Sequence, residues 1–207
     1  FSVVKYTGNS GNATIGHGLD EAPELVIYKS IDNSRNWMVQ AEARTNTSNY
    51  LHLNLSDAYA NYPNYFHTTT DETIGIQVGD PTTNANEDYI AYCFHSVDGY
   101  QKVGSYTGVT GSKTVYTDSN GDGTGTGAFQ PRFLLVKCTN VARSWSILDS
   151  ARNPSNPKNL FLYPFLNSAE QSSSANQVNF NSDGFTFPGD GADTNRNTYE
   201  YIYLAIA

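Results

Sequence analysis

Short segments of alternating apolar and polar positions recur along the chain. The pattern is clearest over residues 37–41, 51–55 and 74–78, where every second side chain is apolar. Successive side chains of a strand point to opposite faces, so this period predicts strands with one face in a core and the other in solvent. Such half-buried strands are typical of antiparallel sheets.

Denser runs of apolar and aromatic residues predict buried strands over residues 25–28, 89–94, 133–136 and 199–206. Helix signals are almost absent. The best helix candidate is Ser56–Tyr65, where a proline and several asparagines favour a turn or one short coil of helix instead.

The chain also contains two copies of one sequence pattern. Tyr6-Thr7-Gly8 reappears as Tyr106-Thr107-Gly108, 100 positions later (106 − 6). A second set of matches lies 108 positions apart (131 − 23) and includes both tryptophans: Pro23, Lys29, Arg35, Trp37, Ala43 and Arg44 against Pro131, Lys137, Arg143, Trp145, Ala151 and Arg152. The offset drifts to 112 at Tyr89 and Tyr201 (201 − 89), as expected for insertions in loops.

These patterns together predict the fold class. We expect an all-β protein of antiparallel β-sandwich or jelly-roll type, built from two copies of a ~100-residue repeat. The predicted copies are residues 1–98 and 99–207. Each should hold about six strands, and the short connection between them predicts that they pack as one pseudo-symmetric body.

Composition narrows the classes of function. Charged residues make up 15% of the chain, 12 Lys and Arg are spread along it, and the formal net charge is −8. Nucleic-acid binding needs a clustered basic surface, which the sequence lacks. Anionic membranes are disfavoured for the same reason, and no window is apolar enough for a transmembrane helix. We therefore expect neither a nucleic acid nor a membrane as partner.

Two features concern processing and redox state. The chain begins with Phe1, so we expect a processed product or a piece of a longer polypeptide. Cys93 and Cys138 each lie within an apolar run. Two buried free thiols are the simpler interpretation, and a disulfide between them stays open because it depends on strand adjacency.

Several blocks carry a resemblance to a known family: residues 1–9, 15–19, 22–27, 89–94, 97–100, 104–108, 129–137 and 145–152. They resemble a duplicated β domain found in bacteriophage tail-fibre and other virion structural proteins. The resemblance covers essentially the whole chain and implies a structural or adhesion module without known catalytic residues. By analogy with fibres it also implies a homo-oligomer, a trimer, in contact with other virion proteins. The loop Asp118–Gly127 looks longer than the family's usual form.

That loop holds the sharpest local motif. Asp118, Asn120 and Asp122 place oxygen-bearing side chains at alternate positions, and a glycine follows. Ca²⁺ prefers hard oxygen ligands of this kind, so calcium is the one candidate cofactor. The twelfth loop position is Phe129 rather than the glutamate of an EF-hand. A plain glycine-rich turn, in which the side chains cap backbone amides, is the alternative. Asp190-Gly-Ala-Asp193 is a weaker candidate of the same type.

Catalytic motifs are not evident. Asp71-Glu72 and Glu87-Asp88 are adjacent pairs whose side chains would point to opposite faces of a strand, so neither forms an acid–base dyad. The four histidines lack metal-ligand spacing. We expect a protein that is not an enzyme.

Aromatic residues suggest where contacts form. Tyr59, Tyr62 and Tyr65 cluster in one polar segment and are the predicted contact surface, because tyrosine is enriched at interfaces. Trp37 and Trp145 occupy matched positions, for which core packing is favoured over stacking on a sugar. Arg44 and Arg152 are expected to anchor carboxylates of their own copies.

The sequence thus favours a virion module, a tail fibre or surface decoration, that presents a rigid β platform for host attachment or assembly. It would be located on the virion surface or extracellularly, and a host surface glycan is a candidate ligand. The alternatives are a secreted carbohydrate-binding module and a polysaccharide depolymerase with an inter-subunit site.

Overall fold

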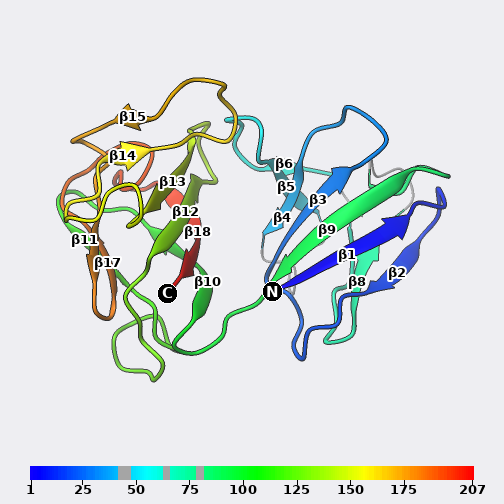
Figure 1. Cartoon of the computed structure of the whole chain (residues 1–207), viewed down its shortest axis with the longest axis horizontal. Coiled ribbons are helices and arrows are strands. Elements are labelled where there is room, and N and C mark those ends of the chain that lie inside the picture. Colours follow the sequence, from blue (N-terminus) through cyan, green and yellow to red (C-terminus); the bar gives the residue numbers. More distant parts are fainter. Residues whose placement is uncertain (42–47, 63–65, 78–81) are drawn as a thin grey trace. The chain divides into compact units, whose positions relative to one another are not determined.

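A computed structural model describes residues 1–41, 48–62, 66–77 and 82–207. The protein is all-β, as predicted, and the part of the chain so described contains strands and no helix (Figure 1). It accordingly offers no long apolar helix that could cross a membrane. The chain divides into two compact units. Unit 1 comprises Phe1–Asn54 and Tyr59–His95, and unit 2 comprises Leu55–Ala58 and Ser96–Ala207.

Unit 1 holds two antiparallel sheets. One has the strand order β1-β9-β3-β4-β5-β6, and the other has the order β2-β8-β7. Figure 1 shows β9 between β1 and β3 in the larger sheet. The strands are β1 (Ser2–Thr7), β2 (Ala13–Gly16), β3 (Leu25–Ser30), β4 (Met38–Ala41), β5 (Asn49–His52), β6 (Ala60–Asn61), β7 (Phe66–His67), β8 (Thr73–Ile76) and β9 (Asp88–Phe94).

Unit 2 holds three antiparallel sheets, with the strand orders β10-β18-β12-β13, β11-β17-β16 and β14-β15. Its first strand pairs with its last, as β1 pairs with β9 in unit 1. The strands are β10 (Gln101–Thr107), β11 (Lys113–Tyr116), β12 (Phe133–Cys138), β13 (Trp145–Asp149), β14 (Leu160–Phe161), β15 (Gln171–Ser172), β16 (Asn179–Asn181), β17 (Gly184–Phe187) and β18 (Glu200–Ile206).

Each unit has its own hydrophobic core, and each core draws side chains from two sheets. In unit 1, Tyr28 and Met38 of the larger sheet pack in one cluster with Ile74 of the smaller sheet. In unit 2, Leu134 of β12 and Phe185 of β17 belong to one cluster. Aromatic rings dominate the second core, where Tyr106 stacks on Tyr201 with ring centroids 5.0 Å apart. Burial of these large apolar surfaces is the main stabilising contribution to both units.

The structure corrects two local expectations. Leu51–Leu55 was expected to form one strand, but β5 ends at His52 and a turn follows. For Ser56–Tyr65 a turn or one short coil of helix was expected, and its described residues are irregular except for the two-residue strand β6. Val78 and residues 63–65 lie outside the described residues. The described residues of each unit form nine strands rather than about six, because several strands of two or three residues are too short to show a period in the sequence.

Burial on both faces is a feature of the central strands. In β3, Val26 and Tyr28 face the core, and Leu25 and Ile27 on the opposite face are also buried. β12 is buried in the same way, including Leu135 on the face away from the core cluster. A strand that is covered on both faces has a continuous run of apolar residues. This explains why apolar and polar residues do not alternate in these segments.

Candidate functional site

The predicted calcium residues lie in the loop after β11, and two of them meet at Thr124. Asp122 Oδ1 accepts hydrogen bonds from Thr124 N at 2.9 Å and from its Oγ1 at 2.6 Å. Asn120 Nδ2 donates to the same Oγ1 at 3.1 Å. The bonds from Thr124 hold the pKa of the Asp122 carboxyl below its usual range. Both side chains therefore brace the turn.

Asp118 is bonded differently. Its side chain is buried, and Oδ2 accepts a hydrogen bond from Gly125 N at 2.5 Å. This approach requires glycine, because a Cβ on Gly125 would lie 2.5 Å from Ser119 Oγ and 2.7 Å from Asn120 N. Asp118 Oδ1 is buried without a hydrogen-bond partner, which is uncommon for a carboxylate oxygen.

A complete cation site is not assembled around this oxygen. No group of three or more His, Cys, Asp or Glu side chains that could hold a metal ion occurs among the described residues. Asp118 Oδ1 is the open ligand position, whereas Asn120 and Asp122 are engaged with Thr124. Calcium binding stays a prediction.

The predicted tyrosine surface is described only in part. Tyr62 is exposed and Tyr59 is partly buried. Tyr65 lies outside the described residues. Tyr62 N donates to Ser48 O at 3.0 Å, which ties the backbone of this segment to the start of β5. A contact role for these tyrosines also stays a prediction.

The two tryptophans differ in environment. Trp145 is buried at the start of β13, as expected for core packing. Trp37 is only partly buried and stacks on Tyr92 of β9, with ring centroids 6.2 Å apart. The expectation of core packing is therefore wrong for Trp37. The sequence could not separate the two, because burial of matched positions depends on what covers each sheet face.

The cysteines are free and buried. Burial raises the pKa of Cys93 to about 12 and also raises the pKa of Cys138. Neither thiol has the lowered pKa of a reactive nucleophile. Both are packing residues of their cores.

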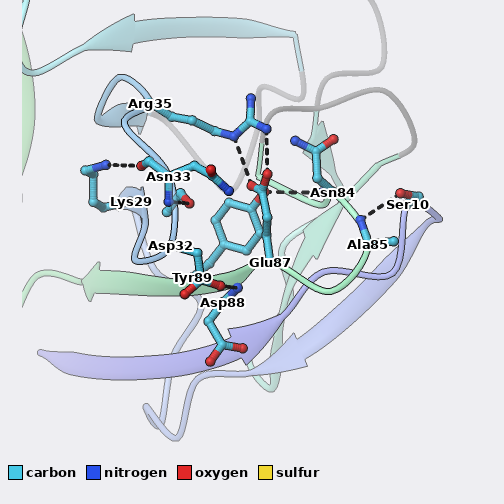
Figure 2. A network of polar contacts seen from close by, with 11 residues as sticks. Ser10, Lys29, Asp32, Asn33, Arg35, Asn84, Ala85, Glu87, Asp88 and Tyr89 are labelled. Atoms are coloured by element: carbon cyan, nitrogen blue, oxygen red, sulfur yellow. Dashed lines mark hydrogen bonds and ion pairs between the residues drawn. The ribbon is translucent and has the colours of Figure 1, made fainter.

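A polar network joins the start of β9 and the loop before it to the loop after β3 in unit 1 (Figure 2). Arg35 donates to both carboxylate oxygens of Glu87, from Nε at 2.9 Å and from Nη2 at 2.6 Å. Tyr89 Oη donates to Glu87 Oε2 at 2.5 Å and accepts from Asn84 N at 3.2 Å. Hydrogen bonds from Arg35, and then from Tyr89, lower the pKa of Glu87 to about 2. These charge-assisted hydrogen bonds link the two loops, so the network braces them.

Unit 2 has matching contacts at matching positions. Tyr201 Oη accepts from Arg196 N at 3.0 Å, as Tyr89 Oη accepts from Asn84 N in unit 1. Arg143 lies over the ring of Tyr199 at 5.7 Å from its centroid, where unit 1 has the Arg35–Glu87 ion pair. A cation–π contact thus replaces a salt bridge.

Arg152 behaves as expected from the sequence. Its Nε lies 2.6 Å from Asp149 Oδ2, and its Nη1 lies 2.5 Å from Glu170 Oε2. It therefore anchors two carboxylates of its own unit. Arg44, its predicted equivalent, lies outside the described residues.

Lys137 is a buried cation, and its burial was not predicted from the sequence. Its Nζ donates to the carbonyl oxygens of Cys138 and Arg143, both at 2.8 Å, and of Ser56 at 3.3 Å. Three acceptors match the three protons of an ammonium group. Burial lowers the pKa of Lys137 to about 8. The amine holds the segment Leu55–Ala58 within unit 2.

Two hollows on the surface of unit 2 are lined by loops and strand edges. One, of about 520 Å³, is lined by segments 174–177 and 188–192 and by Arg196. The other, of about 300 Å³, lies where β10 and β11 approach each other, and we call it the β10–β11 hollow. Its walls include Lys102 and Lys113, with Tyr106 and Tyr203 beneath them. A third hollow, in unit 1, is lined by Ser34, Arg35, Asn36, Met38 and His52.

The whole chain, residues 1–207, matches one family, described as Domain of unknown function (DUF7483). The chain belongs to this family. No curated protein and no solved structure matches it. Membership in the DUF7483 family therefore establishes common ancestry with its members and does not assign an activity.

The β10–β11 hollow of this DUF7483 domain was not predicted from the sequence. Lys102 and Lys113 are 11 positions apart (113 − 102) and lie on different sheets. Only the pairing of β10 with β18 and of β11 with β17 makes each of them part of an edge strand. A faint sequence signal existed, because two of only 12 basic residues flank the Gly104–Gly108 block.

Proposed function

We propose that this chain is a structural and adhesion module of a bacteriophage virion, a tail fibre or surface decoration. It would present a rigid β platform for host attachment and act by binding rather than by catalysis. The resemblance of its sequence blocks to virion proteins suggests the setting. The observation that carries the platform role is that matched positions of the two units hold loop-bracing contacts rather than reactive groups.

We further propose that the two units are copies of one ancestral repeat. The strand order β1-β9-β3-β4 in unit 1 has the same form as β10-β18-β12-β13 in unit 2. Tyr6 faces Tyr89 in the first pairing, and Tyr106 faces Tyr201 in the second.

Loop contacts follow the same offsets. Tyr6 Oη donates to Thr82 O at 2.9 Å, and Tyr106 Oη donates to Thr194 O at 2.5 Å. The acceptors are 112 positions apart (194 − 82), the offset already seen between Tyr89 and Tyr201. Two sheets contribute to each core, which supports a sandwich architecture for each copy.

Such a platform suits a fibre. Two aromatic cores and continuous antiparallel pairing give stiff elements, so ligand groups on loops and edges are presented without much loss of conformational entropy on binding. As partners we propose further copies of the chain, a trimer by analogy with fibres, other virion proteins, and a host surface glycan.

Particle association tests this proposal. Antibodies raised against the chain should label purified phage particles in electron micrographs and should slow adsorption of the phage to its host. Chain that is released free into the culture medium, with unlabelled particles and normal adsorption, would contradict the virion role. Saturable glycan binding by such free monomer would instead support the secreted carbohydrate-binding module.

A further inference from the structure

The β10–β11 hollow combines positive charge with unpaired hydrogen-bonding groups at the open edges of two sheets. β10 is the edge strand of the sheet β10-β18-β12-β13, and β11 is the edge strand of the sheet β11-β17-β16. Edge strands leave backbone N–H and C=O groups without a ladder partner. The hollow of about 300 Å³ lies between them.

Hydrogen bonding shows which groups of β10 face outward. Val103 lies opposite Leu204, yet its N and O bond to Ser96 Oγ on the far side of the strand, at 3.1 and 3.3 Å. Backbone groups of an antiparallel strand alternate between its two edges. The N–H and C=O of Ser105 therefore point to the open edge as well.

In β11, the pairing with β17 shows which backbone groups face outward. Thr117 N donates to Asp183 O at 3.0 Å, which continues the ladder with β17. Two residues earlier, Val115 also bonds toward β17, so Thr114 directs its N–H and C=O to the open edge. Ser105 and Thr114 are both exposed and both line the hollow.

Two ammonium groups add charge to this edge. Lys102 Nζ donates to Ser119 O at 2.9 Å, which holds it against the loop after β11 and leaves two of its protons available. Lys113 is partly buried and makes no ion pair within the described residues. No Asp or Glu lines the hollow. In a chain of net charge −8, two lysines without a carboxylate form a locally positive site.

The floor of the hollow is aromatic. Gly104 lies directly beneath Tyr203, and a Cβ at this position would come within 2.8 Å of the ring. Tyr203 Oη donates to Tyr116 O at 3.4 Å, so the ring is held across the strand. An apolar floor with a rim of hydroxyl, backbone and ammonium groups is the usual make-up of a small-ligand site.

We propose that the β10–β11 hollow binds the anionic group of an acidic saccharide. Lys102 and Lys113 would pair with its carboxylate or phosphate, and the edge groups of Ser105 and Thr114 would bond the neighbouring sugar hydroxyls. This inference rests on the proposed attachment function and names its ligand class. A peptide added as a strand fits less well, because Ser96 already occupies the edge of β10 at Val103.

Unit 1 does not repeat this chemistry. At the offset of 100 that relates Tyr6 to Tyr106, Lys102 corresponds to Ser2 and Lys113 corresponds to Ala13. Lys5 is at the position of Ser105 and forms an ion pair with Asp88 at 2.6 Å. The acidic-saccharide site therefore belongs to unit 2 alone.

Calorimetric titration of the full chain tests the proposal. The probes are trigalacturonate, its neutral carboxyl-reduced form, glucose 6-phosphate and a hexaglutamate peptide. We expect trigalacturonate to bind at least tenfold more tightly than its neutral form and than the peptide. Lys113→Gln should weaken binding about fivefold, the effect of one partly exposed charge pair, and Lys113→Glu should abolish it. Glucose 6-phosphate binding more tightly than trigalacturonate would assign the anionic group as phosphate and still support the site.

Lys29→Gln in unit 1 removes the same charge and is the matched control, expected to bind as the wild type does. Equal affinity for the acidic and neutral saccharides, tighter binding of the peptide, or full affinity in Lys113→Glu overturns the proposal. Melting temperatures confirm that each variant is folded. The antibody labelling of phage particles is a separate measurement. Labelled virions without saccharide binding would overturn this inference alone. Saccharide binding without labelled virions would overturn the virion role alone.

Discussion

At the scale of single residues, the carboxylate of Glu87 shows how hydrogen bonds set a pKa in this protein. It accepts hydrogen bonds from Arg35 at both of its oxygens and from Tyr89 at one of them. These bonds favour the ionised form, which is why the pKa of Glu87 falls to about 2.

Glu87 should therefore make stability depend on pH in acid. Its pKa in the folded protein, about 2, is below the ordinary value of 4.5, so its contribution is complete above the ordinary value and is lost as pH falls toward 2. Glu87→Gln should lower the melting temperature at neutral pH. Between about pH 5 and about pH 3, where the loss of the Glu87 contribution begins, the melting temperature of the variant should fall less steeply than that of the wild type. Glu72→Gln, which alters an exposed carboxylate, is the control. An unchanged acid profile in Glu87→Gln would show that the network contributes nothing to stability.

At the scale of elements, two glycines set how closely the first strand of each unit approaches a later loop. A Cβ on Gly8 would lie 2.2 Å from Asn84 O, and a Cβ on Gly108 would lie 2.2 Å from Arg196 O. Both clashes are with backbone, which cannot move aside as a flexible side chain can. The two loops are 112 positions apart (196 − 84).

Gly8→Ala and Gly108→Ala are accordingly expected to destabilise the protein by similar amounts, about 1–3 kcal/mol, the cost of overpacking a tight contact. Urea unfolding measures both. Gly16→Ala is the control, because the nearest atom to its Cβ would be Glu72 O at 3.9 Å. If only one of the first two variants is destabilised, the proposed equivalence of the loops fails.

The loop after β11 is the second element with a testable property. Excess calcium should raise the melting temperature of the wild type, because an ion that binds only the folded state stabilises it by mass action, by about 2.7 kcal/mol at a hundredfold excess over Kd. Asp118→Asn and Asp122→Ala should remove the increase, and Asp190→Asn should retain it. Equal melting with calcium and with chelator would assign the loop to the plain glycine-rich turn.

At the scale of the whole molecule, the division into units determines which fragments fold. The main segment of unit 2 begins at Ser96, and the unit also includes the separate segment Leu55–Ala58. The sequence pattern placed the boundary between the two copies after Asp98. Ser96 Oγ bonds to both backbone groups of Val103, and Val97 bridges to Gln101.

We therefore expect fragment 96–207 to be more stable than fragment 99–207, which loses these contacts at the edge of β10. Both should be less stable than the intact chain, since Lys137 loses Ser56 O as an acceptor. Thermal melting of the purified fragments followed by circular dichroism measures the order. Equal melting of the two fragments would show that the Ser96 contacts are dispensable.

The sequence alone was sufficient for the all-β, antiparallel class and for the principal strands. Residues 25–28, 89–94 and 133–136 all lie within strands of the structure, because period and apolar density are local properties that a strand imposes on its own residues. The paired tyrosines were likewise visible in the sequence, at offsets of 100 for Tyr6 and Tyr106 (106 − 6) and 112 for Tyr89 and Tyr201 (201 − 89).

Only the tertiary structure decided what those strands bring together. It separated buried Trp145 from partly buried Trp37, gave Lys137 its three carbonyl acceptors, and brought Lys102 and Lys113 of two different sheets to one hollow. These outcomes depend on which strands lie at a sheet edge and on what covers each face. Such pairings are between residues far apart in the chain, and no local period encodes them.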